Sequence, residues 1–213
     1  MNTQARDTQV RFRARDLWLE GLLGGPKDAK AGVVICHPHP LYGGNMRNFV
    51  VRAVAKALQA RDFATLRFNF RGVGQSEGTY DGGRGEMNDA LGALDYLTSC
   101  LPPGTPIGLA GYSFGGMVAF RAAAAGADIV ALAGIAPVID PPEVLTRFGR
   151  PKLIVIGTAD DLVDPQYVRR LVDTAMPDPK VFRLLEGADH FFSERESEVG
   201  EVVADFFTTC LRG

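Results

Sequence analysis

The feature that most constrains the fold is a regular alternation of short apolar runs with stretches whose apolar residues recur every three or four positions. An unbroken apolar run is typical of a strand buried on both faces, and the wider spacing is typical of a helix with one buried face. The expected strands are 31–36, 63–70, 106–111, 129–135, 152–156 and 181–185, and the expected helices are 49–58, 87–101, 114–125, 165–175 and a last helix reaching 211. Repeated strand–helix units predict a mostly parallel sheet with helices on both faces.

The two ends of the chain carry different signals. Residues 9–23 alternate apolar and polar positions around a polar break at Arg15-Asp16, which predicts an antiparallel hairpin. Ser193 and Glu196 have the spacing of a capping box, which predicts the start of the last helix. Together these patterns predict an α/β fold, a three-layer α/β/α sandwich with a sheet of about eight strands, in one domain over residues 1–213.

Composition limits the classes of partner. Lys plus Arg number 23 and Asp plus Glu number 25, so the near-neutral charge gives no reason to expect nucleic acid or an anionic membrane. No apolar run reaches the roughly 20 residues of a membrane span, and no signal peptide is visible, so we expect a cytoplasmic protein acting on a small molecule. Three cysteines are too few for a disulfide framework and are expected to be reduced, buried and inert: Cys36, Cys100 and Cys210.

A serine motif occurs twice in the chain. Gly-x-Ser-x-Gly is present at Gly74–Gly78 and at Gly111–Gly115. A nucleophile elbow needs a strand, a sharp turn and a helix around this motif. Ser113 lies between the strand expected at 106–111 and the helix expected at 114–125. Ser76 is followed by glycine-rich loop sequence, so it is interpreted as structural or as part of a rim. Ser113 is the candidate nucleophile.

A serine nucleophile needs a base and an acid that orients the base. His190 follows the strand expected at 181–185, so it is placed at the edge of the sheet where ligands bind, although a plain loop or capping histidine is the alternative. The acid should follow the strand at 152–156, where Asp160 and Asp161 are both candidates. Asp164 precedes a proline and a helix, and is better explained as an N-cap.

The order of serine, aspartate and histidine is that of α/β-hydrolases. The motifs that carry the resemblance are His37-Pro38-His39-Pro40-Leu41-Tyr42-Gly43-Gly44-Asn45, Arg71-Gly72-Val73-Gly74-Gln75-Ser76-Glu77-Gly78, Gly111-Tyr112-Ser113-Phe114-Gly115 and the segment 157–163. Over nearly its whole length the chain resembles the α/β-hydrolase superfamily, and more closely its small lidless bacterial serine hydrolases of the carboxylesterase and dienelactone hydrolase type. The resemblance implies a catalytic triad of Ser113, Asp160 and His190, and selects Asp160 over Asp161.

Acyl transfer also requires N–H donors for the developing oxyanion. The residue after the nucleophile, Phe114, supplies one of them, and the loop after the strand at 31–36 supplies the other. Neither Pro38 nor Pro40 has an N–H to donate, which leaves His39 or Leu41. The resemblance favours His39.

Two interpretations of the sequence, as a metal site and as a dinucleotide-binding motif, are rejected. His37 and His39 have the spacing of metal ligands, but prolines surround them and a third ligand would have to be His190, which would remove the base. Gly72-Val73-Gly74 invites a dinucleotide reading, but the next glycine is at the wrong distance and no helix is expected to follow. We therefore expect neither a metal nor a cofactor.

The expected site is open. Only residues 138–150 separate two successive strands at the place where lidded relatives insert a cap, so no cap domain fits. The site would be bordered by Leu41, Tyr42, Tyr80, Tyr112 and the loop at 138–139, of which Leu41, Tyr42 and Tyr112 are the candidate substrate-binding residues.

The leading hypothesis is a serine hydrolase of small carboxylic esters or thioesters, most simply a carboxylesterase working through an acyl-enzyme. The same residues could instead cleave an amide, peptide or carbon–carbon bond. A non-catalytic binding protein on a hydrolase scaffold is the third alternative, although such a protein would have no physical need for all three residues.

Overall fold

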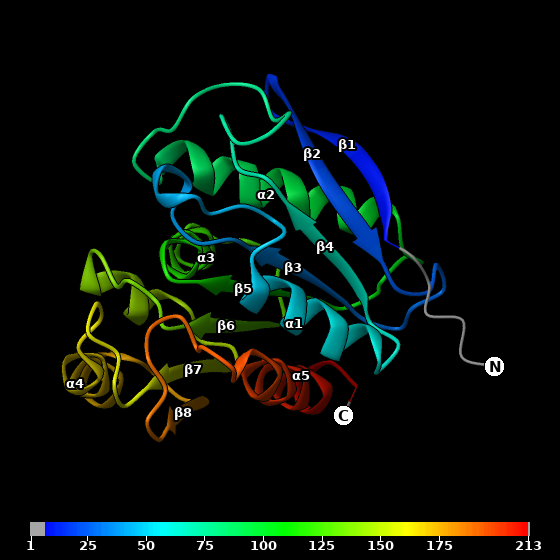
Figure 1. The fold of residues 1–213 in the computed structure, drawn as a ribbon. Helices are drawn as coiled ribbons and strands as arrows, with labels where there is room; N and C mark the ends of the chain where they lie inside the picture. The colour runs from blue at the N-terminus through cyan, green and yellow to red at the C-terminus, as the bar shows by residue number, and fades with distance from the viewer. Residues whose placement is uncertain (1–6, 213) are drawn as a thin grey trace.

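The computed structural model describes residues 7–212 and contains one sheet of eight strands (Figure 1). The strands are β1 (Thr8–Ala14), β2 (Leu17–Gly24), β3 (Gly32–Cys36), β4 (Ala64–Phe68), β5 (Ile107–Tyr112), β6 (Ala131–Ile135), β7 (Lys152–Gly157) and β8 (Lys180–Leu185). The helices are α1 (Phe49–Gln59), α2 (Arg84–Ser99), α3 (Phe114–Ala124), α4 (Pro165–Ala175) and α5 (Glu196–Arg212), with short 3₁₀ helices η1 (Pro40–Tyr42) and η2 (Pro142–Arg147).

The strand order is β1-β2-β4-β3-β5-β6-β7-β8. β1, β2 and β4 pair antiparallel, and every pair from β4 to β8 is parallel. The predicted N-terminal hairpin and mostly parallel sheet of about eight strands are therefore confirmed. Because the strands from β4 to β8 run in one direction, their C-terminal ends meet at one edge, which is where such sheets bind ligands.

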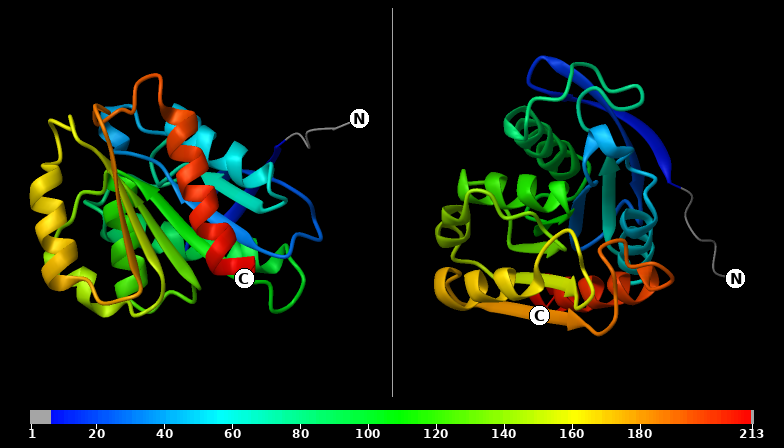
Figure 2. Two further views of the ribbon diagram at one scale, coloured as in Figure 1. Left: turned by 90° about the horizontal axis from the view of Figure 1, so that it is seen from below. Right: turned by 60° about the vertical axis from the view of Figure 1, so that its left-hand side comes forward.

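The helices form two layers around the sheet (Figure 2). α1 and α5 pack against each other on one face, while α2 and α3 pack together on the other and α4 joins them through η2. β3, β4, β5, β6 and β7 consist entirely of buried residues, as the unbroken apolar runs predicted. η2 is the one helical element between β6 and β7 in the described chain, so the fold carries no cap, as expected.

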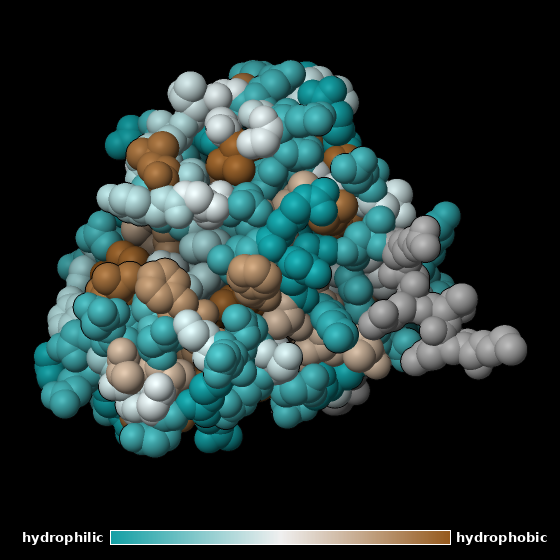
Figure 3. All heavy atoms as spheres, viewed as in Figure 1, coloured by the Kyte–Doolittle hydropathy of each residue, from teal (hydrophilic) through white to brown (hydrophobic). Residues whose placement is uncertain are grey.

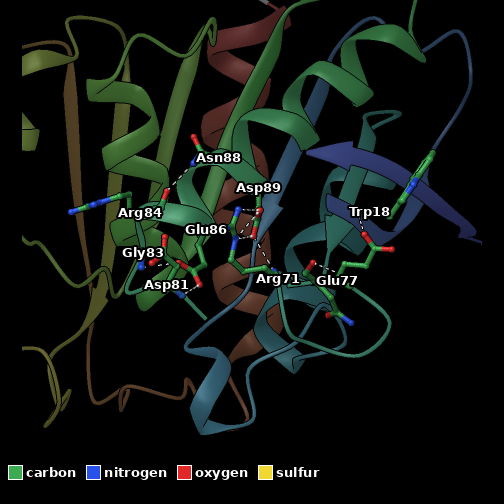
Figure 4. Close-up of polar contacts among 11 residues, drawn as sticks. Trp18, Arg71, Glu77, Asp81, Gly83, Arg84, Glu86, Asn88 and Asp89 are labelled. Carbon is green, nitrogen blue, oxygen red and sulfur yellow. Dashed lines mark hydrogen bonds and ion pairs between the residues drawn. The ribbon is translucent and has the colours of Figure 1, made fainter. Parts of the chain in front are cut away.

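Some boundaries differ from the sequence prediction. α2 begins at Arg84 rather than at residue 87, because the Glu86 carboxylate accepts hydrogen bonds from the N–H groups of Asp81 and Gly83 and closes the first turn (Figure 4). The predicted capping box at Ser193 is wrong. The N–H and hydroxyl of Ser193 both donate to Asp189, at 3.0 and 2.9 Å, and α5 begins only at Glu196.

The three cysteines are all unpaired thiols. Cys36 is fully buried in β3, and burial raises the pKa of its thiol far above the usual value, so it stays protonated. Cys100 and Cys210 are only half-buried, which corrects the expectation that all three lie in the core. Cys100 directly follows α2 and Cys210 lies in the last turns of α5, where a helix end leaves one side open. Among residues 7–212, no helix combines the length and apolar content that a membrane span requires.

Candidate active site

The turn between β5 and α3 holds Ser113 in a strained conformation. Its φ is 54° and its ψ is −116°, a region that residues other than glycine rarely adopt. Its N–H donates to the Ile135 carbonyl at the end of β6, at 2.8 Å. The flanking glycines permit the sharp turn, because a Cβ at Gly111 would lie 2.1 Å from the Gly115 carbonyl oxygen, and one at Gly115 would lie 2.5 Å from the Cys36 carbonyl oxygen. This is the geometry of a nucleophile elbow.

A hydrogen-bonded chain runs from Ser113 into the protein. The Nε2 atom of His190 lies 3.1 Å from the Ser113 Oγ, and its Nδ1 lies 2.8 Å from the Asp160 Oδ2. A carboxylate only accepts hydrogen bonds, so Nδ1 carries the proton and the lone pair of Nε2 faces the serine hydroxyl. The side chains of His190 and Asp160 are 5% and 0% exposed, so water does not compete for these bonds. Such a chain can take a proton from a serine.

The structure distinguishes among the three aspartates that follow β7. The second oxygen of Asp160 accepts from the N–H groups of Leu162 and Val163, at 3.0 and 2.8 Å, which fixes the carboxylate toward His190. Asp161 is exposed, and among residues 7–212 the hydrogen bond and ion pair of His190 go to Asp160 instead. Asp164 accepts from the Gln166 N–H and caps α4, as the sequence predicted.

Tyr112 lies behind the histidine rather than at the border of the site. Its side chain is 2% exposed, and its hydroxyl donates to the His190 carbonyl oxygen at 3.0 Å. Burial raises the pKa of this phenol, and the nearby carboxylates of Asp160 and Asp189 raise it further, so it remains a donor. The Tyr112 hydroxyl therefore holds the backbone of His190, and a contact of Tyr112 with substrate stays a prediction.

The loop after β3 uses the backbone N–H groups of the two candidate oxyanion donors differently. The N–H of Leu41 is already used, since it donates to the His39 Nδ1 at 3.2 Å. Within residues 7–212, no hydrogen bond uses the backbone N–H of His39. Phe114 is the first residue of α3, and the first N–H groups of a helix have no acceptor inside the helix. The N–H groups of His39 and Phe114 are thus free to bind an oxyanion.

An aromatic cluster supports this loop. The ring of His39 lies 4.8 Å from that of Phe114, 4.7 Å from that of Tyr42 and 5.1 Å from that of Tyr80, measured between centroids. Because the Nδ1 of His39 accepts from Leu41, its Nε2 carries the proton and donates to the Tyr80 hydroxyl oxygen, at 3.2 Å. Partial burial lowers the pKa of His39 and keeps this ring neutral.

The segment that carries Tyr80 is fixed by two buried carboxylates on α2 (Figure 4). The guanidinium of Arg71 forms an ion pair of 2.8 Å with Asp89, which also accepts from the Arg71 N–H at 2.9 Å. Asp89 and Glu86 are both fully buried, and Glu86 holds the N–H groups of Asp81 and Gly83. The sequence analysis missed both carboxylates, although Asp89 and Glu86 interrupt the apolar side of a helix.

Exposed apolar side chains surround the mouth of the site. Leu41 is 67% exposed and Tyr42 is 86% exposed, and both follow His39 in the loop after β3. Leu162 and Phe191, next to the acid and the base in sequence, are also exposed and were missed by the sequence analysis. Brown and tan side chains interrupt the hydrophilic surface on the left of Figure 3, over the C-terminal ends of the strands.

His37 is a structural residue and has no lone pair left for a metal. Its Nδ1 donates to the Pro38 carbonyl oxygen at 2.6 Å, and its Nε2 accepts from the Phe70 N–H at 3.1 Å. Burial lowers the pKa of His37 to about 4. In the described part of the chain, no three His, Cys, Asp or Glu side chains are grouped as metal ligands.

Comparisons with known proteins identify the family and the fold. The model of the alpha/beta hydrolase fold family matches residues 33–147, more than half of the chain. The chain belongs to the α/β-hydrolase fold family. A serine hydrolase homologue from Coxiella burnetii is 34% identical, with a TM-score of 0.85 over 93% of this chain and 96% of the other. A serine hydrolase without a lid from Xanthomonas campestris is 27% identical, with a TM-score of 0.86 over 98% and 96%.

A sequence relative extends this result. An uncharacterized protein of Rickettsia prowazekii is 32% identical over 211 residues, which cover 94% of this α/β-hydrolase and 89% of the relative. The family that the sequence motifs resembled is therefore confirmed, together with the lidless form of the fold. The neighbours are similar in fold and class, and they leave the substrate of this hydrolase open.

Proposed function

We propose that this α/β-hydrolase is a serine esterase or thioesterase that cleaves small acyl substrates through an acyl-enzyme formed on Ser113. The single observation that carries the proposal is the hydrogen-bonded chain from Ser113 through His190 to Asp160, placed at a strained elbow beside two free N–H groups. A residue that serves only to shape a turn has no need of such a chain.

In the first half of the reaction, the Nε2 of His190 takes the hydroxyl proton of Ser113 while the Oγ attacks the substrate carbonyl. The electron pair of the C=O bond moves to the oxygen, which binds the N–H groups of His39 and Phe114. Asp160 stabilises the charged imidazole. When the tetrahedral intermediate collapses, the bond to the alcohol or thiol breaks and His190 gives its proton to that leaving group.

In the second half, water replaces the leaving group. His190 takes a proton from the water, the hydroxide attacks the acyl carbon, and the same two N–H groups hold the second oxyanion. Collapse releases the carboxylic acid and returns the proton to the Oγ of Ser113. Both halves of the reaction depend on these preorganised donors, because removing one donor from an oxyanion hole lowers the rate by about 100- to 1000-fold.

The surroundings of Ser113 favour short acyl chains with large leaving groups. Without a cap, no second wall encloses a long chain, while Leu162 and Phe191 offer apolar surface beside the base and the acid. Tyr42 and Leu41 offer apolar surface on the oxyanion side. A leaving group can therefore extend into solvent without a steric limit, which suits exposed alcohols and thiols.

The test is the pre-steady-state hydrolysis of p-nitrophenyl esters and of matched acyl thioesters, with acyl chains from two to twelve carbons. We expect a burst of leaving group stoichiometric with enzyme, and kcat/KM highest for the short chains. Loss of the burst in Ser113→Ala completes the expected result. Absence of hydrolysis with every ester and thioester, alongside cleavage of an amide or carbon–carbon bond, would contradict the proposal.

A further inference from the structure

A cavity lined by arginines lies apart from Ser113, and its lining comes from the start of α1, β4 and the N-terminal hairpin. Figure 1 shows the course of these elements. Its volume is about 630 Å³, and its lining consists of Asp7, Gln9, Leu22, Arg47, Arg52 and Arg67. The lining therefore holds three guanidinium groups against one carboxylate, which leaves two positive charges in excess. None of these residues takes part in the hydrolase site described above.

Arg67 is the buried part of this cavity. It lies in β4, a strand buried along its whole length, and its side chain is only 8% exposed. One terminal nitrogen donates to the Met46 carbonyl oxygen at 3.0 Å and the other forms an ion pair with Asp7. Its Nε is buried and has no hydrogen-bond partner among the described residues. A buried cation with an unused donor is costly unless a ligand or a role offsets it.

The other two guanidinium groups have no counter-ion. Arg47 and Arg52 are exposed, and within residues 7–212 neither side chain forms an ion pair or a hydrogen bond. Several arginines elsewhere in the fold do form ion pairs with carboxylates, among them Arg61, Arg71, Arg121, Arg169 and Arg195. Like charges around one cavity repel each other, so this cluster is less favourable empty than with an anion bound.

The carboxylate of Asp7 occupies the position in which the oxygens of a bound anion would be held. Its carboxylate pairs with Arg67 through one oxygen and accepts from the Gln59 amide through the other, at 2.9 Å. Gln59 also donates to Thr65, which lies two residues before Arg67 on the same face of β4. The donors around Asp7 are therefore fixed in position by the sheet and by α1, as a built anion site requires.

We propose that this cavity binds the phosphoryl dianion of inorganic phosphate or of a phosphate monoester. A dianion matches the two excess charges of the lining, and guanidinium groups bind phosphate oxygens in a bidentate fashion. In the occupied site, Arg47 and Arg52 contact the phosphoryl oxygens from the open side, and the anion competes with Asp7 for Arg67. The proposal is independent of the esterase activity, because it concerns residues that the hydrolase site does not use.

The test is isothermal titration calorimetry of the full chain with inorganic phosphate and with phenyl phosphate, at pH 8 and constant ionic strength. The double variant R47Q/R52Q changes two exposed residues and should weaken binding at least about tenfold. The matched control K27Q/K30Q removes two exposed charges from the β2–β3 loop, outside the cavity, and should leave the affinity unchanged. Asp7→Asn removes the competing charge and should tighten binding about three- to tenfold.

The titrations distinguish the two sources of the phosphoryl group. Tighter binding of phenyl phosphate than of phosphate supports a monoester ligand, and equal binding supports the free ion. The proposal is overturned by the absence of binding to the unchanged protein. It is overturned equally by a loss of affinity in K27Q/K30Q as large as in R47Q/R52Q, which would indicate general charge attraction, or by weaker binding in Asp7→Asn.

Discussion

The segments that follow β4 and β5 contain the same serine motif, and the structure uses them in opposite ways. After β4, the Ser76 hydroxyl donates to the Asn69 carbonyl oxygen at 2.7 Å and accepts from the Glu20 N–H at 3.1 Å. His37 binds the backbone of the same segment through the Phe70 N–H. After β5, Ser113 and its histidine bind side chains instead.

The difference lies in the partners rather than in the motif. The hydrogen bonds of the Ser76 hydroxyl and the His37 imidazole go to backbone groups, and their protons are donated to backbone carbonyl oxygens. A hydroxyl that faces the lone pair of His190, itself oriented by Asp160, has a path for its proton. A Gly-x-Ser-x-Gly motif therefore indicates a nucleophile only where the strand, the turn and a side-chain base accompany it.

The largest expected effect separates the two serines. Ser113→Ala removes the nucleophile and should lower kcat by about 10⁴-fold or more, whereas Ser76→Ala should change it by less than about twofold. The measurement is kcat for a p-nitrophenyl ester with both variants purified to the same homogeneity. A comparable loss in the two variants would end the distinction between the segments.

The second effect concerns the acid. Asp160→Asn removes the charge that stabilises the imidazolium and lets His190 adopt the wrong tautomer, so kcat should fall by about 10⁴-fold. Asp161→Asn, its exposed neighbour, is the matched control and should keep nearly full activity. Steady-state kinetics at pH 8 make the comparison, and a larger loss in Asp161→Asn would show that the other aspartate is the acid.

The third effect is a pH dependence of folding stability that arises from His37. Its pKa is about 4 in the folded protein, lowered by burial from 6.5. Between these pH values, His37 is protonated in the unfolded chain and neutral in the folded one. The free energy of unfolding is therefore unaffected by His37 above pH 6.5. It decreases as the pH falls toward 4, by at most about 3 kcal/mol. Urea unfolding at several pH values measures the slope.

The variant that isolates this effect is His37→Gln, which has no titrating ring. Its free energy of unfolding should decline less steeply between pH 6.5 and pH 4 than that of the unchanged protein, whatever its absolute stability. Identical slopes in the two proteins would mean that other groups cause the acid sensitivity.

A smaller effect is expected on the stability of the β4 segment. Ser76→Ala leaves the Glu20 N–H and the Asn69 carbonyl without their partner, and the serine is only 7% exposed. The free energy of unfolding should fall by about 1–3 kcal/mol. Chemical denaturation at pH 8 checks this, and an unchanged stability would show that water replaces the hydroxyl without cost.

The smallest expected effect concerns the hydrogen bond that holds the backbone of His190. Tyr112→Phe deletes the hydrogen bond to the His190 carbonyl oxygen, worth about 0.5–1.5 kcal/mol, and keeps the ring. We expect a several-fold lower kcat with an unchanged KM and a shifted acidic limb of the pH–rate profile. If the KM rises while kcat stays constant, Tyr112 contacts substrate after all.

The arrangement of strands was predictable because it depends on local patterns. Runs such as 31–36 and 153–156 are apolar at every position, which is typical of a strand buried on both faces of a parallel sheet. Ser113, Asp160 and His190 follow β5, β7 and β8, whose C-terminal ends lie at one edge of the sheet, so their meeting in space follows from the topology.

The features that sequence analysis missed depend on distant contacts. Tyr112 is the last residue of β5, and nothing local shows that its hydroxyl reaches residue 190. Arg67 reads as an anomaly in an apolar strand, and its partner Asp7 is 60 residues away. The apparent capping box at Ser193 failed because Asp189, which forms a tight turn with it, competes for the same hydroxyl.

Ser113, and not Ser76, is the proposed nucleophile of this α/β-hydrolase. The most direct measurement is labelling with a fluorophosphonate, followed by mass spectrometry of the tryptic peptides. We expect a single adduct on Ser113, reduced labelling in Asp160→Asn, and none in Ser113→Ala. An adduct on Ser76, or undiminished labelling of the Ser113→Ala protein, would contradict it.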